Sequence, residues 1–187
     1  MDSVIAAVLK GNKEALQQCL GVLNTVTDTH YTLVQPPVVV SSLGSHFRHI
    51  LDIYRALMLA ESHNTEISGD SRPLVNYDKR RRGASCERDI AMAKSEIAAL
   101  QCWLQGLDEQ RILGCIWVQS EVALEETNSV VVGSSLLREL IFASSHAVHH
   151  LAIISMVANV QCINIDSGLG VAPATATFLR DQAKTNA

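Results

Sequence analysis

The sequence predicts an all-α fold: a four-helix bundle with long connections, a small hairpin or extended insertion, and a short C-terminal helix. Apolar residues recur at the helical period of 3.6 over four long stretches, which is typical of bundle helices. Hydrophobic residues make up 48% of the 187 residues, enough to bury a substantial core. We therefore expect one helical-bundle domain spanning residues 1–187.

Two helices are expected in the N-terminal third. The first covers residues 3 to about 26, where apolar positions keep helical spacing. Two prolines at 36–37 prevent a helix from continuing there, because proline lacks the amide hydrogen. Two serines at 41–42 offer capping oxygens for a second helix over about 43–60. The polar stretch 61–76, which contains glycine and proline, is expected to be a loop.

The C-terminal two thirds predict two further long helices around an interruption. The third helix is expected to begin near residue 77 or 83 and to end at Gly106. Residues 111–125 are rich in β-branched and aromatic side chains over short runs, which favours a hairpin or extended segment. The fourth helix is expected over about 134–160, and Pro173 favours the start of a short terminal helix.

Composition excludes several classes of partner. The net charge of -4 and the 4% aromatic content argue against nucleic acid, because neither phosphate attraction nor base stacking is favoured. The N-terminus lacks a signal-like segment, and no apolar run is expected to span a membrane. Five scattered cysteines without a CxxC pair indicate free thiols in a reducing compartment. We expect a cytoplasmic protein that binds neither nucleic acid nor membrane.

Three histidines lie close together in the stretch SSHAVHHLAI, residues 144–153. On a helix, His146 and His150 lie about 40° apart and one turn along the axis, so both rings share one face. His149 lies about 100° from His150 and belongs at the rim of that face. The spacing indicates that His146 and His150 can bind one cation together.

A second histidine cluster, HFRHILD, lies on the predicted second helix. In a bundle, His49 or His46 can meet the His146 and His150 pair across the interior. Three histidines leave coordination positions open, as in catalytic zinc sites. His49 is the preferred third ligand because Asp52 follows one turn later, and His46 is the alternative. Asp52 is expected to orient a ligand histidine or to act as a catalytic base.

Four segments together resemble the DinB-like four-helix-bundle family: SSLGSHFRHILDIYRAL, NYDKRRR, LLRELIFASSHAVHHLAII and GLGVAPATATF. The resemblance extends over nearly the whole chain. It implies a metal site of three histidines, one from an early helix and two spaced four apart on a later helix, often holding nickel or zinc. Carried over to this sequence, it implies His49, His146 and His150 as ligands.

The resemblance also implies an activity. Family members of known function resemble thiol-dependent S-transferases that use low-molecular-weight thiols, so we expect a metal-dependent thiol S-transferase or hydrolase. A divalent ion would lower the pKa of a bound thiol or water and so supply a nucleophile. The alternative is a non-catalytic metal-binding or helical interaction protein. A homodimer is expected from the resemblance and from the apolar composition.

Overall fold

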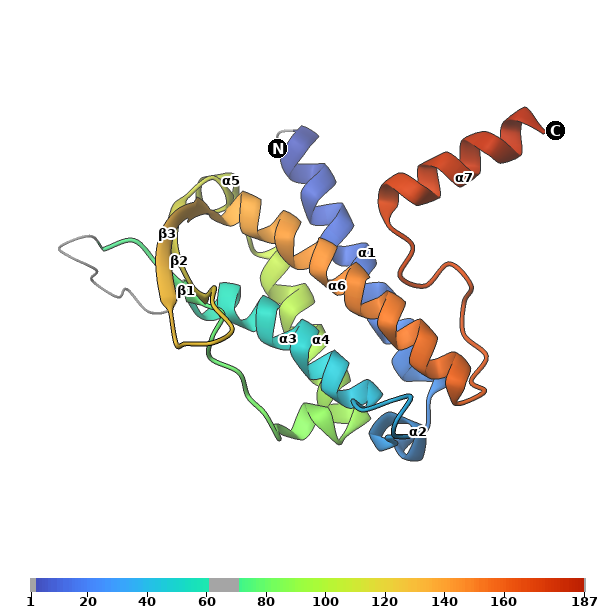
Figure 1. The fold of residues 1–187 in the computed structure, drawn as a ribbon. Helices are drawn as coiled ribbons and strands as arrows, with labels where there is room; N and C mark the ends of the chain where they lie inside the picture. Colours follow the sequence, from blue (N-terminus) through green and yellow to red (C-terminus); the bar gives the residue numbers. More distant parts are fainter. Residues whose placement is uncertain (1–2, 61–70, 187) are drawn as a thin grey trace.

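The computed structural model describes residues 3–60 and 71–186 (Figure 1). Seven α-helices, one short 3-10 helix and three strands lie in this part of the chain. In chain order they are α1 Ser3–Thr25, α2 Asp28–Thr32, α3 Leu43–Ala60, β1 Leu74–Asn76, η1 Ser85–Glu87, α4 Ile90–Gln105, α5 Glu109–Ile112, β2 Cys115–Glu121, β3 Ser129–Ser135, α6 Leu136–Val160 and α7 Pro173–Thr185.

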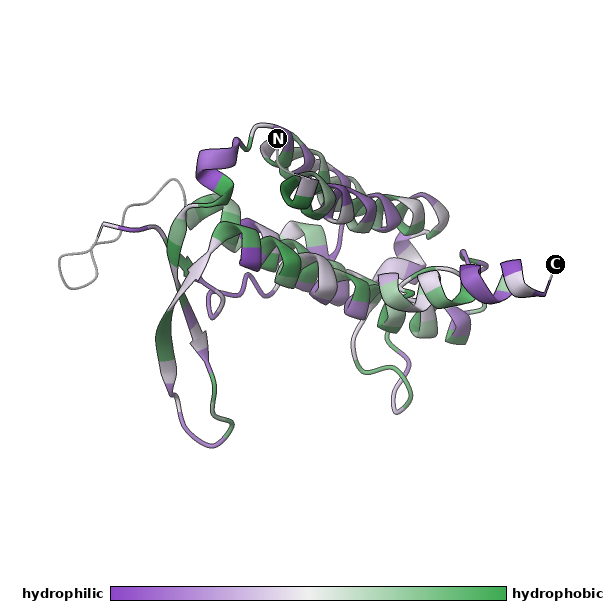
Figure 2. Cartoon of the chain, turned by 90° about the horizontal axis from the view of Figure 1, so that it is seen from above, coloured by the Kyte–Doolittle hydropathy of each residue, from purple (hydrophilic) through white to green (hydrophobic). Residues whose placement is uncertain are grey.

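Four long helices, α1, α3, α4 and α6, pack around one hydrophobic core. Helix α1 contacts α6 and α4, and α3 contacts the same two helices from the other side. In Figure 2, apolar residues concentrate along these helices. The periodic apolar stretches of the sequence therefore form the helices that share this core.

The expectation of an all-α fold is wrong, because the structure combines the helices with a three-stranded mixed sheet. Strands β2 and β3 form a hairpin, with Val118 opposite Val132. Only β2 lies within the stretch 111–125 where a hairpin or extended segment was expected, and β3 follows beyond it. Strand β1 then adds in parallel on the other side of β2, with Val75 beside Val118. Its three residues lie in the stretch 61–76 that was expected to be a loop, of which 61–70 lies outside the described residues.

Side-chain caps set the observed helix starts. Ser42 accepts a hydrogen bond from the Ser45 amide at 3.1 Å, as expected for the start of α3. Helix α4 begins later than predicted because Asp89 caps it, accepting from the amides of Ala91 and Met92. Ser135 caps α6 in the same way, so that helix begins just after the predicted start.

By length and composition, helix α6 is long and apolar enough to cross a membrane. This differs from the expectation that no apolar run of the sequence is long enough to span a membrane. Such a helix is weak evidence for a membrane span, because core helices of soluble proteins meet the same criterion. Helix α6 contacts α1 and α3 and carries Glu139, which is buried. Only 33% of its most apolar 18-residue window is buried, so packing in the core does not by itself account for its apolar composition. The absence of membrane binding stays a prediction.

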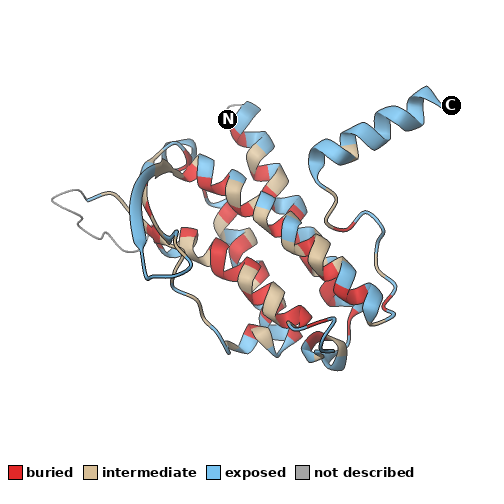
Figure 3. Ribbon diagram, viewed as in Figure 1, coloured by how far each residue is buried: buried red, intermediate tan, exposed pale blue. Residues whose placement is uncertain are grey.

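Helix α7 has a different character from the four core helices. Figure 3 shows it almost entirely exposed and apart from the bundle, and it contains no buried residue. Pro173 lies in its first turn, as expected. The connection that leads to it packs closely on α6 at Gly170, where an added Cβ would overlap the backbone at Ala152.

Candidate metal centre

Four histidines meet at the contact between α3 and α6. Helix α3 presents two of them one turn apart, and α6 presents the other two, four residues apart on one face. All four side chains are half-buried. We call this group the histidine cluster: His46, His49, His146 and His150.

Three members of the histidine cluster lie close enough to bind one ion. Each of His49, His146 and His150 offers a ring nitrogen, and these nitrogens all lie within 4.8 Å of one another. The Nε2 atoms of His49 and His146 are 2.7 Å apart. The ring of His150 lies 4.5 Å from that of His49 and 4.7 Å from that of His146, measured between centroids. These three residues are the set predicted from the sequence.

The other two candidate histidines take different positions. His46 contacts His150 through their Nδ1 atoms, 3.2 Å apart, so one ring donates a hydrogen bond to the other. His149 is exposed, and its ring centroid lies 6.1 Å from that of His146. His46 thus lies beside the group of three, and His149 lies at its rim as the helical geometry predicts.

The environment of the histidine cluster favours neutral imidazoles. Burial, together with neighbouring positive charges, lowers the pKa of both His49 and His150 to about 3. Burial also lowers the pKa of His46 and His146. Neutral imidazole is the form that binds metal ions, so these rings are in the binding form at neutral pH without first losing a proton.

The distances suit a metal ion after a small adjustment. Nitrogens bound tetrahedrally at about 2.0–2.1 Å from zinc lie about 3.3 Å apart. The Nε2 atoms of His49 and His146 are closer than this, and the widest pair of the three is farther apart. Nδ1 of His49, the ring nitrogen that does not contact His146, is buried without a hydrogen-bond partner in the described structure, so no side chain orients this ring through it. The three histidines can hold a metal ion.

Asp52 lies one turn beyond His49 but belongs to a separate group of charges. Its Oδ1 accepts from Nε of Arg81 at 2.7 Å, and its Oδ2 accepts from the Arg48 guanidinium at 2.7 Å. The Arg81 amide also donates to Oδ2, at 3.1 Å. Both carboxylate oxygens of Asp52 are therefore occupied by arginines, and its expected role as a base or an orienting group stays a prediction.

The arginines around Asp52 connect to two further carboxylates. Arg81 binds Glu96 through two hydrogen bonds of 3.0 and 2.8 Å, and Arg48 approaches Glu87 at 2.8 Å. We call this group the Asp52 ion-pair network: Arg48, Asp52, Arg81, Glu87 and Glu96. It ties the loop before α4 to α3. The i, i+4 spacing of Arg48 and Asp52 is the one part of this network visible in the sequence.

Glu139 shares a helix face with His146 but is also occupied. It accepts hydrogen bonds of 2.7 Å from the Tyr77 hydroxyl and from the Ser134 hydroxyl. The Arg138 guanidinium lies 2.7 Å from the same carboxylate. Glu139 is only 1% exposed, so these donors compensate a buried charge instead of leaving it to a metal ion.

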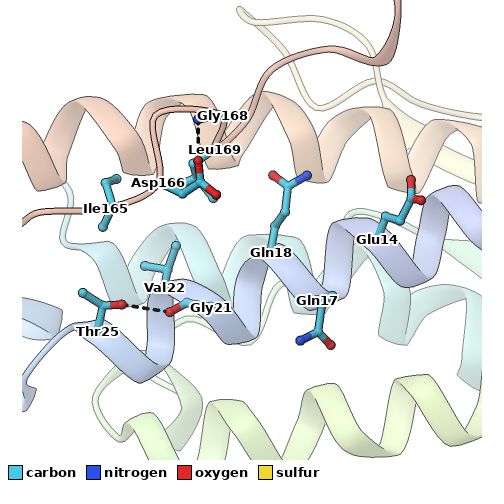
Figure 4. Close-up of a pocket in the computed structure, with 10 residues that line it drawn as sticks. All are labelled: Glu14, Gln17, Gln18, Gly21, Val22, Thr25, Ile165, Asp166, Gly168 and Leu169. Carbon is cyan, nitrogen blue, oxygen red and sulfur yellow. Dashed lines mark hydrogen bonds between the residues drawn. The ribbon is translucent and has the colours of Figure 1, made fainter. Parts of the chain in front are cut away.

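A separate pocket of about 500 Å³ lies between α1 and the turn that precedes α7 (Figure 4). The close-up shows Gln18 and Val22 on α1 pointing toward Asp166 and Leu169 on the turn, whereas Gln17 points away from them. The Gln18 side chain accepts a hydrogen bond from the Gly170 amide at 3.1 Å. None of the histidine cluster lines this pocket, so it is distinct from the metal centre.

Comparison with known proteins found one distant relative. Over 109 residues, which are 58% of this chain, the sequence is 28% identical to FK506-binding protein 5 of Rhizopus delemar. The chain spans only 28% of that protein's length. No protein-family model matches the chain, and no solved structure matches it.

The comparisons overturn the DinB-like assignment, because no such family matches and the relative found is an FK506-binding protein. The thiol S-transferase or hydrolase activity, and the alternative of a non-catalytic helical interaction protein, are corrected with that assignment. Metal binding stays a proposal, because it rests on the histidine cluster and not on the family. The quoted segments misled because they consist mostly of residues that any amphipathic helix uses, and short helical segments of this kind are not specific to one family. The distances within the histidine cluster do not depend on the assignment.

Proposed function

We propose that this protein binds a divalent zinc or nickel ion through His49, His146 and His150. The observation that carries the proposal is the convergence of three ring nitrogens within 4.8 Å from two packed helices. Imidazole nitrogen suits both ions, and an all-nitrogen set disfavours calcium and magnesium, which prefer oxygen ligands.

Three protein ligands leave at least one coordination position for an exchangeable ligand. With an ion bound, water would be able to fill this position. A small thiol is a second candidate occupant, because a bound divalent ion favours the thiolate form. The half-buried rings restrict access to the ion without closing it from solvent.

His46 acts as an orienting partner for His150. Its Nδ1 lies 3.2 Å from Nδ1 of His150, which leaves Nε2 of His150 directed away from that contact and free for the ion. A hydrogen bond of this kind to the second ring nitrogen of a ligand fixes the ring and its tautomer. We therefore propose His46 as an orienting residue and not as the third metal ligand.

A competition titration tests the proposal. The metal-free chain is mixed with a chromophoric chelator and titrated with zinc, and then with nickel. We expect one ion per chain, and we expect the His146→Ala, His150→Ala double variant to bind at least about a thousandfold more weakly, because two of three ligands are gone. His149→Ala is the matched control on the same helix and should keep the wild-type affinity. Equal affinity of wild type and double variant would exclude this site.

We also propose a homodimer, for which strand β3 offers the best support. It forms an edge of the sheet with no strand on its outer side in the described residues, and it carries three partly exposed valines and no charge. Light scattering should give twice the chain mass of 20.3 kDa. Val131→Lys should shift the protein to the monomer, and a monomeric wild type would exclude the dimer.

The similarity to FK506-binding protein 5 supports a distant relationship and nothing more specific. The relative's name says that it binds FK506, but the chain spans 28% of that protein. FK506 binding therefore does not form part of the proposed function.

A further inference from the structure

A second cavity, of about 560 Å³, lies between α3 and the sheet. Helix α3 lines it with residues spaced three and four apart, which places them on one helical face. The opposite wall comes from β1, β2 and the loop after β1. The lining residues are Asp52, Arg55, Ala56, Leu59, Ala60, Leu74, Asn76, Lys79, Arg81 and Gln119.

The charges of the Asp52 ion-pair network balance one another at this cavity. Asp52 is occupied by Arg48 and Arg81, and the Arg81 guanidinium is shared between Asp52 and Glu96. The Asp52 ion-pair network as a whole contains two arginines and three carboxylates, and Arg80 adds a third positive charge 4.0 Å from Asp52. These charges compensate one another, so the network offers no net charge to a ligand.

Two further cations in the cavity have no such compensation. The Arg55 and Lys79 side chains make no ion pair with another residue in the described parts of the chain. Arg55 is half-buried, which leaves its guanidinium less solvated than on an open surface. Lys79 is exposed to solvent, so Arg55 is the less solvated of the two charges. Two positive charges without an ion pair that line one cavity favour a ligand with two negative charges.

The loop that carries Lys79 is held in place before any ligand binds. The Asn76 side chain accepts hydrogen bonds from the amides of Asp78 and Lys79, at 3.0 and 3.2 Å. The same side chain donates to Gln119 on β2 at 2.8 Å. A preorganised loop reduces the entropy lost on binding.

The remaining wall is apolar. Ala56, Leu59 and Ala60 on α3 face Leu74 on β1 across the cavity. Pockets that combine an apolar wall with a few fixed polar groups are typical of small-molecule sites. The ligand is therefore expected to carry a hydrocarbon part as well as its charges.

We propose that this cavity binds a small organic dianion, a phosphate monoester or a dicarboxylate, with its charges on Arg55 and Lys79 and its apolar part between Leu59 and Leu74. The site is separate from the histidine cluster and goes beyond the proposed metal binding. Its occupant needs no metal ion.

Calorimetric titration of the full chain tests this site with two probes, phenyl phosphate and phenylsuccinate. The titrations are done in EDTA, so that failure of the metal proposal leaves them unaffected. We expect saturable binding of at least one probe and weaker binding at high salt. Lys79→Glu should weaken that binding roughly tenfold or more, because it removes one charged hydrogen bond and adds repulsion. Arg55→Gln should weaken it to a similar extent.

Two controls make the result decisive. Lys13 is exposed on α1 outside the cavity, so Lys13→Glu makes the same charge change without touching the site. It should keep the wild-type affinity, as should the His146→Ala, His150→Ala variant. The proposal is overturned if neither probe binds the wild-type chain, or if Lys79→Glu and Lys13→Glu bind equally well while circular dichroism shows both to be folded.

Discussion

The histidine cluster and the Asp52 ion-pair network share helix α3 but differ in how far their polar groups are satisfied. In the network, both oxygens of Asp52 and the guanidinium of Arg81 have partners at 2.7 to 3.1 Å. In the histidine cluster, rings face other rings and Nδ1 of His49 has no partner in the described structure. The comparison teaches that ion pairs between opposite charges stabilise the fold, whereas imidazoles that contact only one another can exchange that contact for a metal ion.

The largest loss of stability should come from a substitution that breaks the Asp52 ion-pair network. Asp52→Ala leaves two arginines without their shared carboxylate, and removing one partner of a buried ion pair costs about 3–5 kcal/mol of unfolding free energy. Urea unfolding of the metal-free chain measures this loss. The matched control is Asp181→Ala on α7, whose carboxylate is exposed and should contribute about 0–1 kcal/mol.

The same variant sharpens the role of Asp52. If the network is only structural, folded Asp52→Ala protein should bind zinc within about threefold of wild type, which is smaller than the effect of an orienting residue. A loss of ten- to a hundredfold would instead show that Asp52 orients a ligand, as the sequence first suggested.

The next effect is expected on metal affinity, when Nδ1 of His150 loses its hydrogen-bond partner. His46→Ala removes its neighbour at 3.2 Å, and loss of such a partner lowers metal affinity by about ten- to a hundredfold. Zinc competition gives the affinity. His149→Ala, on the exposed rim, should change it by less than about twofold, and equal losses in the two variants would contradict an orienting role for His46.

Acid should destabilise the metal-free protein through the histidine cluster. The folded-state pKa of His49 and His150 is about 3, against 6.5 in the unfolded chain. Stability is therefore fully present above pH 6.5 and declines as the pH falls toward 3, because the unfolded state binds protons that the folded state rejects. Between pH 7.5 and 5 we expect a loss of about 1–2 kcal/mol after discounting for solvent screening.

Urea unfolding in EDTA at several pH values measures this loss. The His146→Ala, His150→Ala variant should show a flatter dependence, since it lacks one of the two most strongly shifted rings. A variant with the wild-type slope would place the acid sensitivity elsewhere in the molecule.

The smallest effect on stability is expected for Glu87, at the partly exposed edge of the Asp52 ion-pair network. Burial alone raises the pKa of Glu87, but hydrogen bonds from the Gly83 amide and the Ser45 hydroxyl, with the Arg48 ion pair, hold it below its ordinary value. Its stabilising contribution is present above the unfolded pKa of 4.5 and is lost as the pH falls through the lower folded value.

Glu87→Gln should therefore cost about 1 kcal/mol at pH 7 and less below pH 4. Thermal unfolding at both pH values checks this. The control is Glu14→Gln, whose carboxylate is 64% exposed and pairs with Lys10 at 3.7 Å, and it should have no measurable effect. Equal costs for the two glutamates would contradict the hydrogen-bonded role of Glu87.

Much of the local structure could be predicted because its causes lie within a few residues. The span of α3 follows from the serine cap and the apolar period, and the pairing of His146 with His150 follows from four-residue spacing on a helix. The start of α4 was missed because Asp89 competes as a cap with the earlier residues. The strand β1 was missed because three residues give too short a period-2 pattern to recognise.

The sequence alone determined where the long helices lie and which histidines share a helix face, because both follow from the 3.6-residue period. Tertiary structure decided which histidine of α3 joins His146 and His150, and that Asp52 faces arginines instead of the histidine cluster. It also decided that β1 pairs with β2 and so makes the fold mixed. The physical reason is that these outcomes depend on packing between segments distant in sequence, such as those of His49 and His146, which are 97 positions apart. No local period encodes such a contact.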